Sequence, residues 1–291
     1  MALSLSRLAL LAGASLALAA CGEGAEASSS LSEADKVISP DRAAVDYYVR
    51  PNMLARARTG SEPVPVVVLI EKDPWASVIG ADSPQLALYD DGLLIYRADD
   101  QFRQERLDAA AQAELLDLVA KIDGPRDAGA YELSLSTDQT DTVLLLYRDE
   151  PVVVSAYGSL EDPVQVALLP EQLRAAFAGL HAYSRPHAEP WLPEFIEVMI
   201  WPYDYAPEAS IHWPDDWPGL DDERTAARGS SYSLFLPSAR LEELRAFLQT
   251  RNARGAVELG GKKWAMSYRY PFPMEQLWMP YNPDEERAAA R

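Results

Sequence analysis

The chain has a single cysteine, Cys21, among its 291 residues. One thiol cannot form an intramolecular disulfide, and it excludes a zinc site built from several thiolates. The fold must therefore be held by burial of apolar side chains, which make up 48% of the chain. A chain of this length and composition can build one large domain or two small ones.

Positive charge is also scarce. The chain carries 26 Lys and Arg residues against 45 Asp and Glu residues, which gives a net charge of −19. This balance repels phosphate backbones and anionic lipid, so we expect no nucleic-acid partner. It suits a protein that stays in solution beside a membrane.

The motifs of the common enzyme and nucleotide-binding families are missing from the sequence. There is no Walker A motif, no G-x-G-x-x-G, no G-x-S-x-G and no H-E-x-x-H. The three histidines, His181, His187 and His212, would form a zinc site only if distant segments converged, and surface or hydrogen-bonded histidines are far commoner. The sequence therefore predicts no metal, no cofactor and no catalytic residue.

A long apolar run occurs only at the N-terminus. Arg7 precedes a run of apolar and small residues from Leu8 to Ala20, which ends in Leu18-Ala19-Ala20-Cys21. A positive start, a short apolar stretch and small residues before a cut site are typical of a secretory signal peptide. The run is shorter than the roughly 20 apolar residues that span a bilayer. No other apolar stretch in the sequence is long enough to span a bilayer, so we expect the folded part of the chain to be water-soluble.

This segment resembles the signal of a bacterial lipoprotein, whose lipobox ends in the cysteine that is lipidated and becomes the mature N-terminus. The resemblance implies acylation of Cys21 and a membrane partner held through lipid. Gly22, rather than Asp, follows the cysteine, which by the enteric sorting rule implies the outer membrane, facing the periplasm. The alternative is an ordinary secreted protein with an odd free thiol. The resemblance covers the signal alone, because the folded part resembles no functional family.

Composition divides the rest of the chain. Residues 1–20 are the expected signal peptide, and residues 21–36 are the lipidated cysteine with a small, polar, flexible tether. Such a tether has a root-mean-square reach of about 20 Å. Residues 37–183 and 184–291 are then predicted as two α+β halves, with one continuous domain as the alternative.

Apolar patterns predict the elements of the folded part. Strands are expected at 66–70, 142–147, 152–157, 195–201 and 232–236, and helices at 107–122, at about 170–180 and after Ser238 as N-cap. Asp91-Gly92 and Gly260-Gly261 each separate two apolar runs, which predicts two hairpins. This order indicates an α+β fold with mostly antiparallel sheet built from hairpins and about three packed helices.

The most unusual segment is residues 201–223, which is rich in Trp, Tyr, Pro and acidic residues and has no clear period. Rigid aromatic side chains beside acids can anchor a protein interface or stack on sugars. We therefore predict a binding or interaction module for an envelope protein or cell-wall glycan, and its candidate residues are Trp201, Tyr203, Trp213, Asp215, Asp216 and Trp217. The alternative interpretation is a covering loop, whose Trp rings pack into the body.

Two other chemistries use the same loop. Paired carboxylates, for instance Asp204 and Asp216, would suit an envelope hydrolase acting on glycan, which is the alternative function. The acidic run from Asp215 to Glu223 could bind calcium, but it lacks the EF-hand spacing and is more typical of a solvated face.

A second polar segment, Thr137 to Thr142, lies between two predicted strands. It could present hydroxyls and carboxylates at one end of a sheet. A simple turn is the alternative, because Thr and Asp side chains readily bond to nearby backbone.

Overall fold

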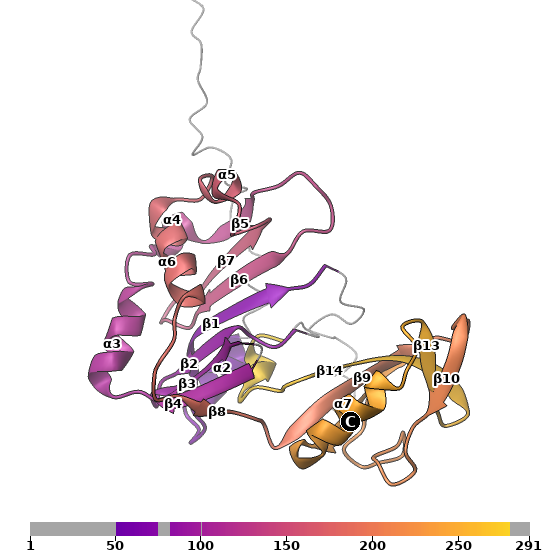
Figure 1. Ribbon diagram of the computed structural model, residues 1–291. Coiled ribbons are helices and arrows are strands. Elements are labelled where there is room, and N and C mark those ends of the chain that lie inside the picture. Colours follow the sequence, from indigo (N-terminus) through magenta and orange to yellow (C-terminus); the bar gives the residue numbers. More distant parts are fainter. Residues whose placement is uncertain (1–50, 75–81, 100, 280–291) are drawn as a thin grey trace, which may run out of the picture. The chain divides into compact units, whose positions relative to one another are not determined.

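The computed structural model describes residues 51–74, 82–99 and 101–279 (Figure 1). The predicted signal peptide, Cys21 and the tether lie outside these residues. The described part contains two β-sheets, of eight and six strands.

The eight-stranded sheet has the order β5-β7-β6-β1-β2-β3-β4-β8. Its strands are β1 (Pro65–Lys72), β2 (Leu86–Tyr89), β3 (Leu93–Ala98), β4 (Gln101–Arg106), β5 (Gly129–Glu132), β6 (Asp141–Leu146), β7 (Val152–Tyr157) and β8 (Glu189–Pro190). The apolar runs predicted as strands at 66–70, 142–147 and 152–157 all form strands of this sheet, which confirms those predictions. The two apolar runs beside Asp91-Gly92, at 86–89 and 93–97, form strands as well.

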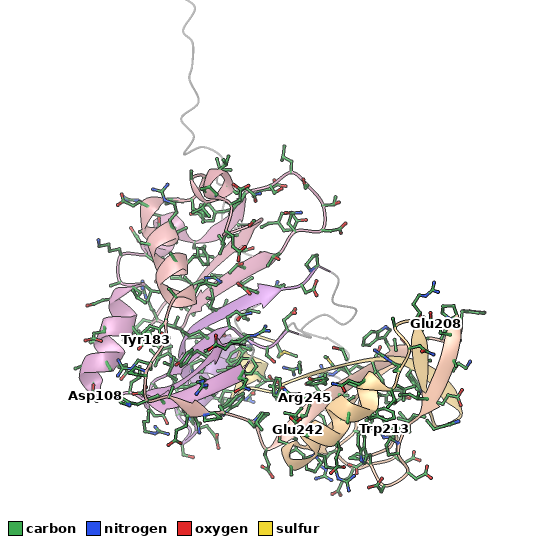
Figure 2. All side chains as sticks on the ribbon, in the orientation of Figure 1. Asp108, Tyr183, Glu208, Trp213, Glu242 and Arg245 are labelled. Atoms are coloured by element: carbon green, nitrogen blue, oxygen red, sulfur yellow. The ribbon has the colours of Figure 1, made fainter. Side chains whose placement is uncertain are left out.

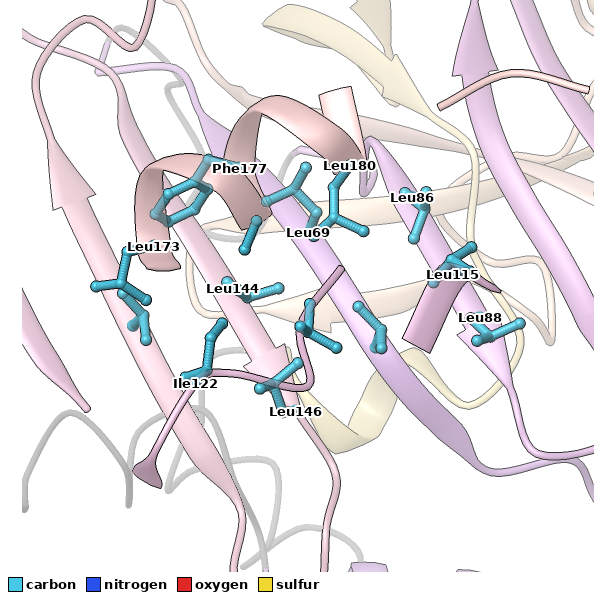
Figure 3. Close-up of a cluster of buried hydrophobic side chains, with 14 of the residues drawn as sticks. Leu69, Leu86, Leu88, Leu115, Ile122, Leu144, Leu146, Leu173, Phe177 and Leu180 are labelled. Atoms are coloured by element: carbon cyan, nitrogen blue, oxygen red, sulfur yellow. The ribbon is translucent and has the colours of Figure 1, made fainter. Parts of the chain in front are cut away.

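Both faces of this sheet are buried at its central strands, which explains why β1, β2 and β6 are continuously apolar rather than alternating. On one face, side chains such as Leu69, Leu88 and Leu144 pack against helices α3 (Ala109–Asp117) and α6 (Glu171–His181) (Figure 3). The other face packs against helix α2 (Pro51–Ala57) and against Phe272, Leu277 and Trp278. A short 3₁₀ helix, η3 (Glu275–Leu277), belongs to that last segment.

The six-stranded sheet has the order β10-β13-β14-β9-β12-β11. Its strands are β9 (Phe195–Pro202), β10 (Glu208–His212), β11 (Ala226–Arg228), β12 (Ser231–Pro237), β13 (Gly255–Leu259) and β14 (Lys262–Arg269). One face packs against helix α7 (Leu241–Gln249), through Leu241, Leu244 and Phe247.

The two predicted hairpins are present. Gly260 and Gly261 both have positive φ, 59° and 72°, and they join β13 to β14 in a two-residue turn of the kind that favours glycine. Gly92, with a φ of 83°, closes the turn between β2 and β3. A Cβ at Gly92 would lie 2.5 Å from the carbonyl oxygen of Leu107, so only glycine fits there.

The α+β class is confirmed, but the prediction of mostly antiparallel sheet needs correction. Both sheets are mixed, because β5 pairs with β7 and β10 pairs with β13 in parallel. Hairpin signals in the sequence report only pairs between neighbouring strands. They carry no information on these two pairs, which join strands separated along the chain.

The helix count also differs from the expected three, because the described residues hold six α-helices. The helices α3, α6 and α7 match the predicted ones; the additional ones are α2 and two four-residue helices, α4 (Gly124–Asp127) and α5 (Pro163–Val166). Ser238 was wrongly predicted as an N-cap. Its hydroxyl donates to the Pro193 carbonyl at 2.5 Å, and it starts a 3₁₀ turn, η2 (Ser238–Arg240), before α7.

The position of β8 bears on the two predicted halves. It follows residue 184 in the chain, yet it pairs with β4 and so belongs to the eight-stranded sheet. The segment around Phe272 likewise packs on that sheet. The division into halves at residue 184 stays a prediction.

Candidate functional site

The loop 201–223 turns its two central Trp rings toward α7. Trp213 and Trp217 are only 5% and 8% exposed. Their rings lie edge to face at 4.8 Å, and both contact the ring of Phe247, at 5.7 Å and 5.5 Å. Trp213 lies beside α7 (Figure 2). The Trp213 indole N–H donates to the Pro218 carbonyl at 3.0 Å. This geometry agrees with the covering-loop interpretation.

The structure does not gather the other candidate residues of the loop around these rings. Trp201 lies on the sheet face opposite to the one that carries Ile200 and α7, because neighbouring residues of a strand alternate. Trp201 and Tyr203 are half-buried, while Asp215 and Asp216 are exposed. A binding role for these residues stays a prediction.

Two carboxylates of the loop, Asp216 and Asp222, bond to arginine residues. Arg240 Nη1 lies 2.7 Å from Asp216 Oδ2, and this hydrogen bond holds the pKa of Asp216 below its ordinary value. Asp222 receives a bond from the Arg224 backbone N–H, which lowers its pKa in the same way. Asp215 and Asp216 line an open hollow of about 910 Å³ that Arg224, Arg240 and Lys262 also line.

A more enclosed pocket, of about 540 Å³, lies between α6 and one end of the eight-stranded sheet. Its walls come from the side of α6, the ends of β1, β6 and α5, and the segments before β6 and after β7. Its lining residues are Glu71, Asp138, Gln139, Thr140, Thr142, Gly158, Ser159, Leu160, Glu161, Val166, Leu169, Arg174, Phe177, Ala178 and His181. We call it the α6 pocket.

Helical periodicity explains which residues of α6 face the pocket. Leu173, Ala176 and Leu180 are buried in the core of the sheet. Arg174, Ala178 and His181 follow the same spacing on the adjacent stripe of the helix and so line the pocket. Strand register supplies the opposite wall, because Glu71 of β1 is paired with Thr142 of β6.

An ion pair closes one end of the pocket. His181 Nε2 lies 2.6 Å from Glu71 Oε1, and His181 Nδ1 lies 2.8 Å from the Phe177 carbonyl oxygen. Both partners are acceptors, so only the doubly protonated imidazolium satisfies both contacts. The other Glu71 oxygen accepts a bond from Gln85 Nε2 at 2.8 Å.

The surroundings favour the charged form of both groups. Burial opposes the charge on His181, but the hydrogen bonds to Glu71 and to the Phe177 carbonyl outweigh it and raise the pKa. His181 is also the last residue of α6, where the helix dipole stabilises a cation. The bond from His181 lowers the pKa of Glu71, although burial opposes this.

The segment before β6 forms the rim of the pocket. Gln139 N–H donates to the Tyr157 hydroxyl at 3.2 Å, and Gly158 N–H donates to the Thr140 carbonyl at 2.9 Å. Asp138 has a positive φ of 60°, which Asp tolerates better than most residues. The segment runs through an irregular connection between β5 and β6, which agrees with the turn alternative. Asp138, Thr140 and Thr142 line the pocket, and a role for their side chains in binding stays a prediction.

Sequence reasoning missed Glu71, Arg174 and the role of His181. Glu71 lies about 100 positions before the two α6 residues, and no local motif links it to them. The available signal was the polar stripe on α6, where Arg174 and His181 lie beside the apolar residues that pack on the sheet.

The contacts of His181 limit what this side chain can do chemically. Both nitrogens of His181 are committed to acceptors, so neither can take a proton from a substrate. Charged, hydroxyl and apolar groups face one space, as in pockets that orient a small ligand. Within residues 51–74, 82–99 and 101–279, no group of three or more His, Cys, Asp and Glu residues is arranged to hold a metal ion.

Comparisons with known proteins add no relative. No protein-family model matches the chain, and no curated protein or solved structure matches it significantly. No helix in the described part is long and apolar enough to cross a membrane.

Proposed function

We propose that this chain is a lipid-anchored cell-envelope protein whose folded body is a binding module for a small ligand. Acylated Cys21 would hold it at the outer membrane, facing the periplasm, and residues 22–36 would serve as the tether. The α6 pocket is the binding site in this proposal.

One observation carries the proposal: a partly open pocket of about 540 Å³ lined by charged, hydroxyl and apolar groups. This volume lies within the range of roughly 300–1,000 Å³ that is typical of small-molecule sites. The His181–Glu71 pair supports it, because its bonds fix one wall of the pocket and leave His181 no free nitrogen that could act as a base.

The hydrolase alternative receives less support. A general acid for glycoside cleavage needs a raised pKa. The Arg240 hydrogen bond instead lowers the pKa of Asp216, and Asp204 is exposed. An envelope protein or cell-wall glycan as partner of loop 201–223 remains a second proposal, supported by Tyr205, which is 96% exposed.

The test blocks the pocket. Ala178 and Ala175 are both exposed residues of α6, but only Ala178 lines the pocket. We expect Ala178→Trp to abolish binding of small molecules from an envelope extract, observed by the broadening of their NMR signals. Ala175→Trp, the matched control, should bind as the unmodified protein does. Equal binding by both variants, or no binding by the unmodified protein, would refute the proposal.

A further inference from the structure

The α6 pocket contains a cation that no side chain neutralises. Arg174 is half-buried on α6 and lines the pocket. Among the described residues it has no ion pair and no side-chain hydrogen bond. A half-buried guanidinium normally finds a carboxylate or phosphate, because its planar donors match two oxygens at once.

Two carboxylates on the rim are uncommitted as well. Asp138 and Glu161 are exposed and line the pocket. Asp138 accepts only from its neighbour Thr137, at 3.3 Å. Glu161 makes no salt bridge among the described residues, although its charge helps to raise the pKa of His181. The third acid, Glu71, is by contrast bound by His181 and Gln85.

This arrangement decides between classes of ligand. A phosphate or other multiply charged anion would meet the two rim carboxylates and the field of a chain with net charge −19. A simple cation would leave the half-buried Arg174 unpaired. A ligand with one carboxylate and one ammonium satisfies both sets of charges.

The pocket also has apolar walls. Leu160, Val166 and Phe177 line it beside the charged groups. A volume of about 540 Å³ exceeds what a single small amino acid needs and leaves space for apolar side chains.

We infer that the α6 pocket binds a short peptide with both termini free and with apolar side chains. Arg174 binds the carboxylate, Asp138 and Glu161 bind the ammonium, and Leu160, Val166 and Phe177 contact the side chains. This inference rests on the proposed function, because it names the ligand class of the same site.

Three probes separate the two charge contacts: the dipeptide leucyl-leucine, its C-terminal amide and its N-acetyl form. Calorimetric titration should show binding of the free dipeptide. Each blocked form should bind at least about tenfold more weakly, since each loses a charge-assisted hydrogen bond.

Substitutions in the protein test which residue makes each of the two charge contacts. Arg174→Gln should weaken binding of the free dipeptide about tenfold or more but leave the amide unchanged, because the amide has no carboxylate to lose. The double variant Asp138→Asn with Glu161→Gln should weaken the free dipeptide and leave the N-acetyl form unchanged. Arg126→Gln, at an exposed arginine of α4 outside the pocket, is the control, and thermal melting checks that each variant folds.

Two results would overturn the inference. They are equal binding of the amide and the free dipeptide, and full binding by Arg174→Gln. Absence of binding by all three probes would also overturn the ligand class. In that case the proposed function stands if Ala178→Trp still blocks binding of an extract compound, and falls with the inference if it does not.

Discussion

The side chain of His181 both joins two elements of the fold and forms an ion pair. Its two nitrogens link the end of α6 to β1 and to its own helix. About a third of each side chain of the pair remains in solvent, at 31% for His181 and 35% for Glu71. The pair should therefore be worth on the order of 1 kcal/mol or less.

The pH dependence of this pair follows from the directions of the two pKa shifts. Because the pKa of His181 is raised in the folded protein, its positive charge stabilises the fold. This stabilisation is fully present below the pKa of about 6.5 that His181 has in the unfolded chain, and it is lost as pH rises through the higher pKa of the folded state. Because the pKa of Glu71 is lowered in the folded protein, its negative charge stabilises the fold above the ordinary pKa of about 4.5. This stabilisation is lost as pH falls through the lower pKa of the folded state.

We therefore expect His181→Gln to reduce the free energy of unfolding most at about pH 5–6 and least at about pH 9. Urea unfolding of both proteins across this range measures the difference. His187→Gln, at an exposed histidine whose side chain makes no hydrogen bond with the described residues, is the control. A loss that is the same at every pH would show that His181 acts by packing alone.

At the scale of elements, the loop 201–223 is a structural part of the six-stranded sheet. Trp213→Ala removes a buried ring that contacts Trp217 and Phe247, so it should lower the free energy of unfolding by about 3–5 kcal/mol. Tyr205→Ala, in the same loop but 96% exposed, should change it by less than about 0.5 kcal/mol. Similar small effects of both substitutions, measured by chemical denaturation, would mean that Trp213 does not pack as described.

Turns and strands that depend on the local sequence were predicted correctly, whereas the α6 pocket was not predicted. The Gly260-Gly261 turn follows from the freedom of glycine at positive φ, which is a local property. The burial of Trp213 depends on α7, which comes later in the chain, so its aromatic character alone suggested a binding surface. The pocket depends on the register of β1 with β6 and on the placement of α6, which no pattern within one segment reveals.

The strand β4 was missed for a related reason. Its sequence, Gln101–Arg106, is polar, because it lies near the sheet edge where only the two-residue β8 covers it. Hydrophobic patterns detect strands that are buried on both faces, such as β1 and β6. Edge strands that remain half in solvent carry a weaker signal.

At the scale of the whole molecule, the proposed anchor rests on Cys21. Replacement of Cys21 by Ala should abolish incorporation of a labelled fatty acid and release the protein from the membrane fraction, since each buried CH₂ contributes about 0.8 kcal/mol. Gly22→Ala should retain the label. Label on the Cys21→Ala protein would exclude Cys21 as the acylation site.

The central claim is that the α6 pocket, rather than the loop 201–223, is the ligand site of the folded body. The most direct measurement is the change in backbone amide NMR shifts of the labelled protein when an envelope extract is added. If the α6 pocket is the ligand site, the shift changes will gather at residues 138–142, 158–161 and along α6. Changes that gather instead at residues 201–223 would contradict it, and so would an unchanged spectrum.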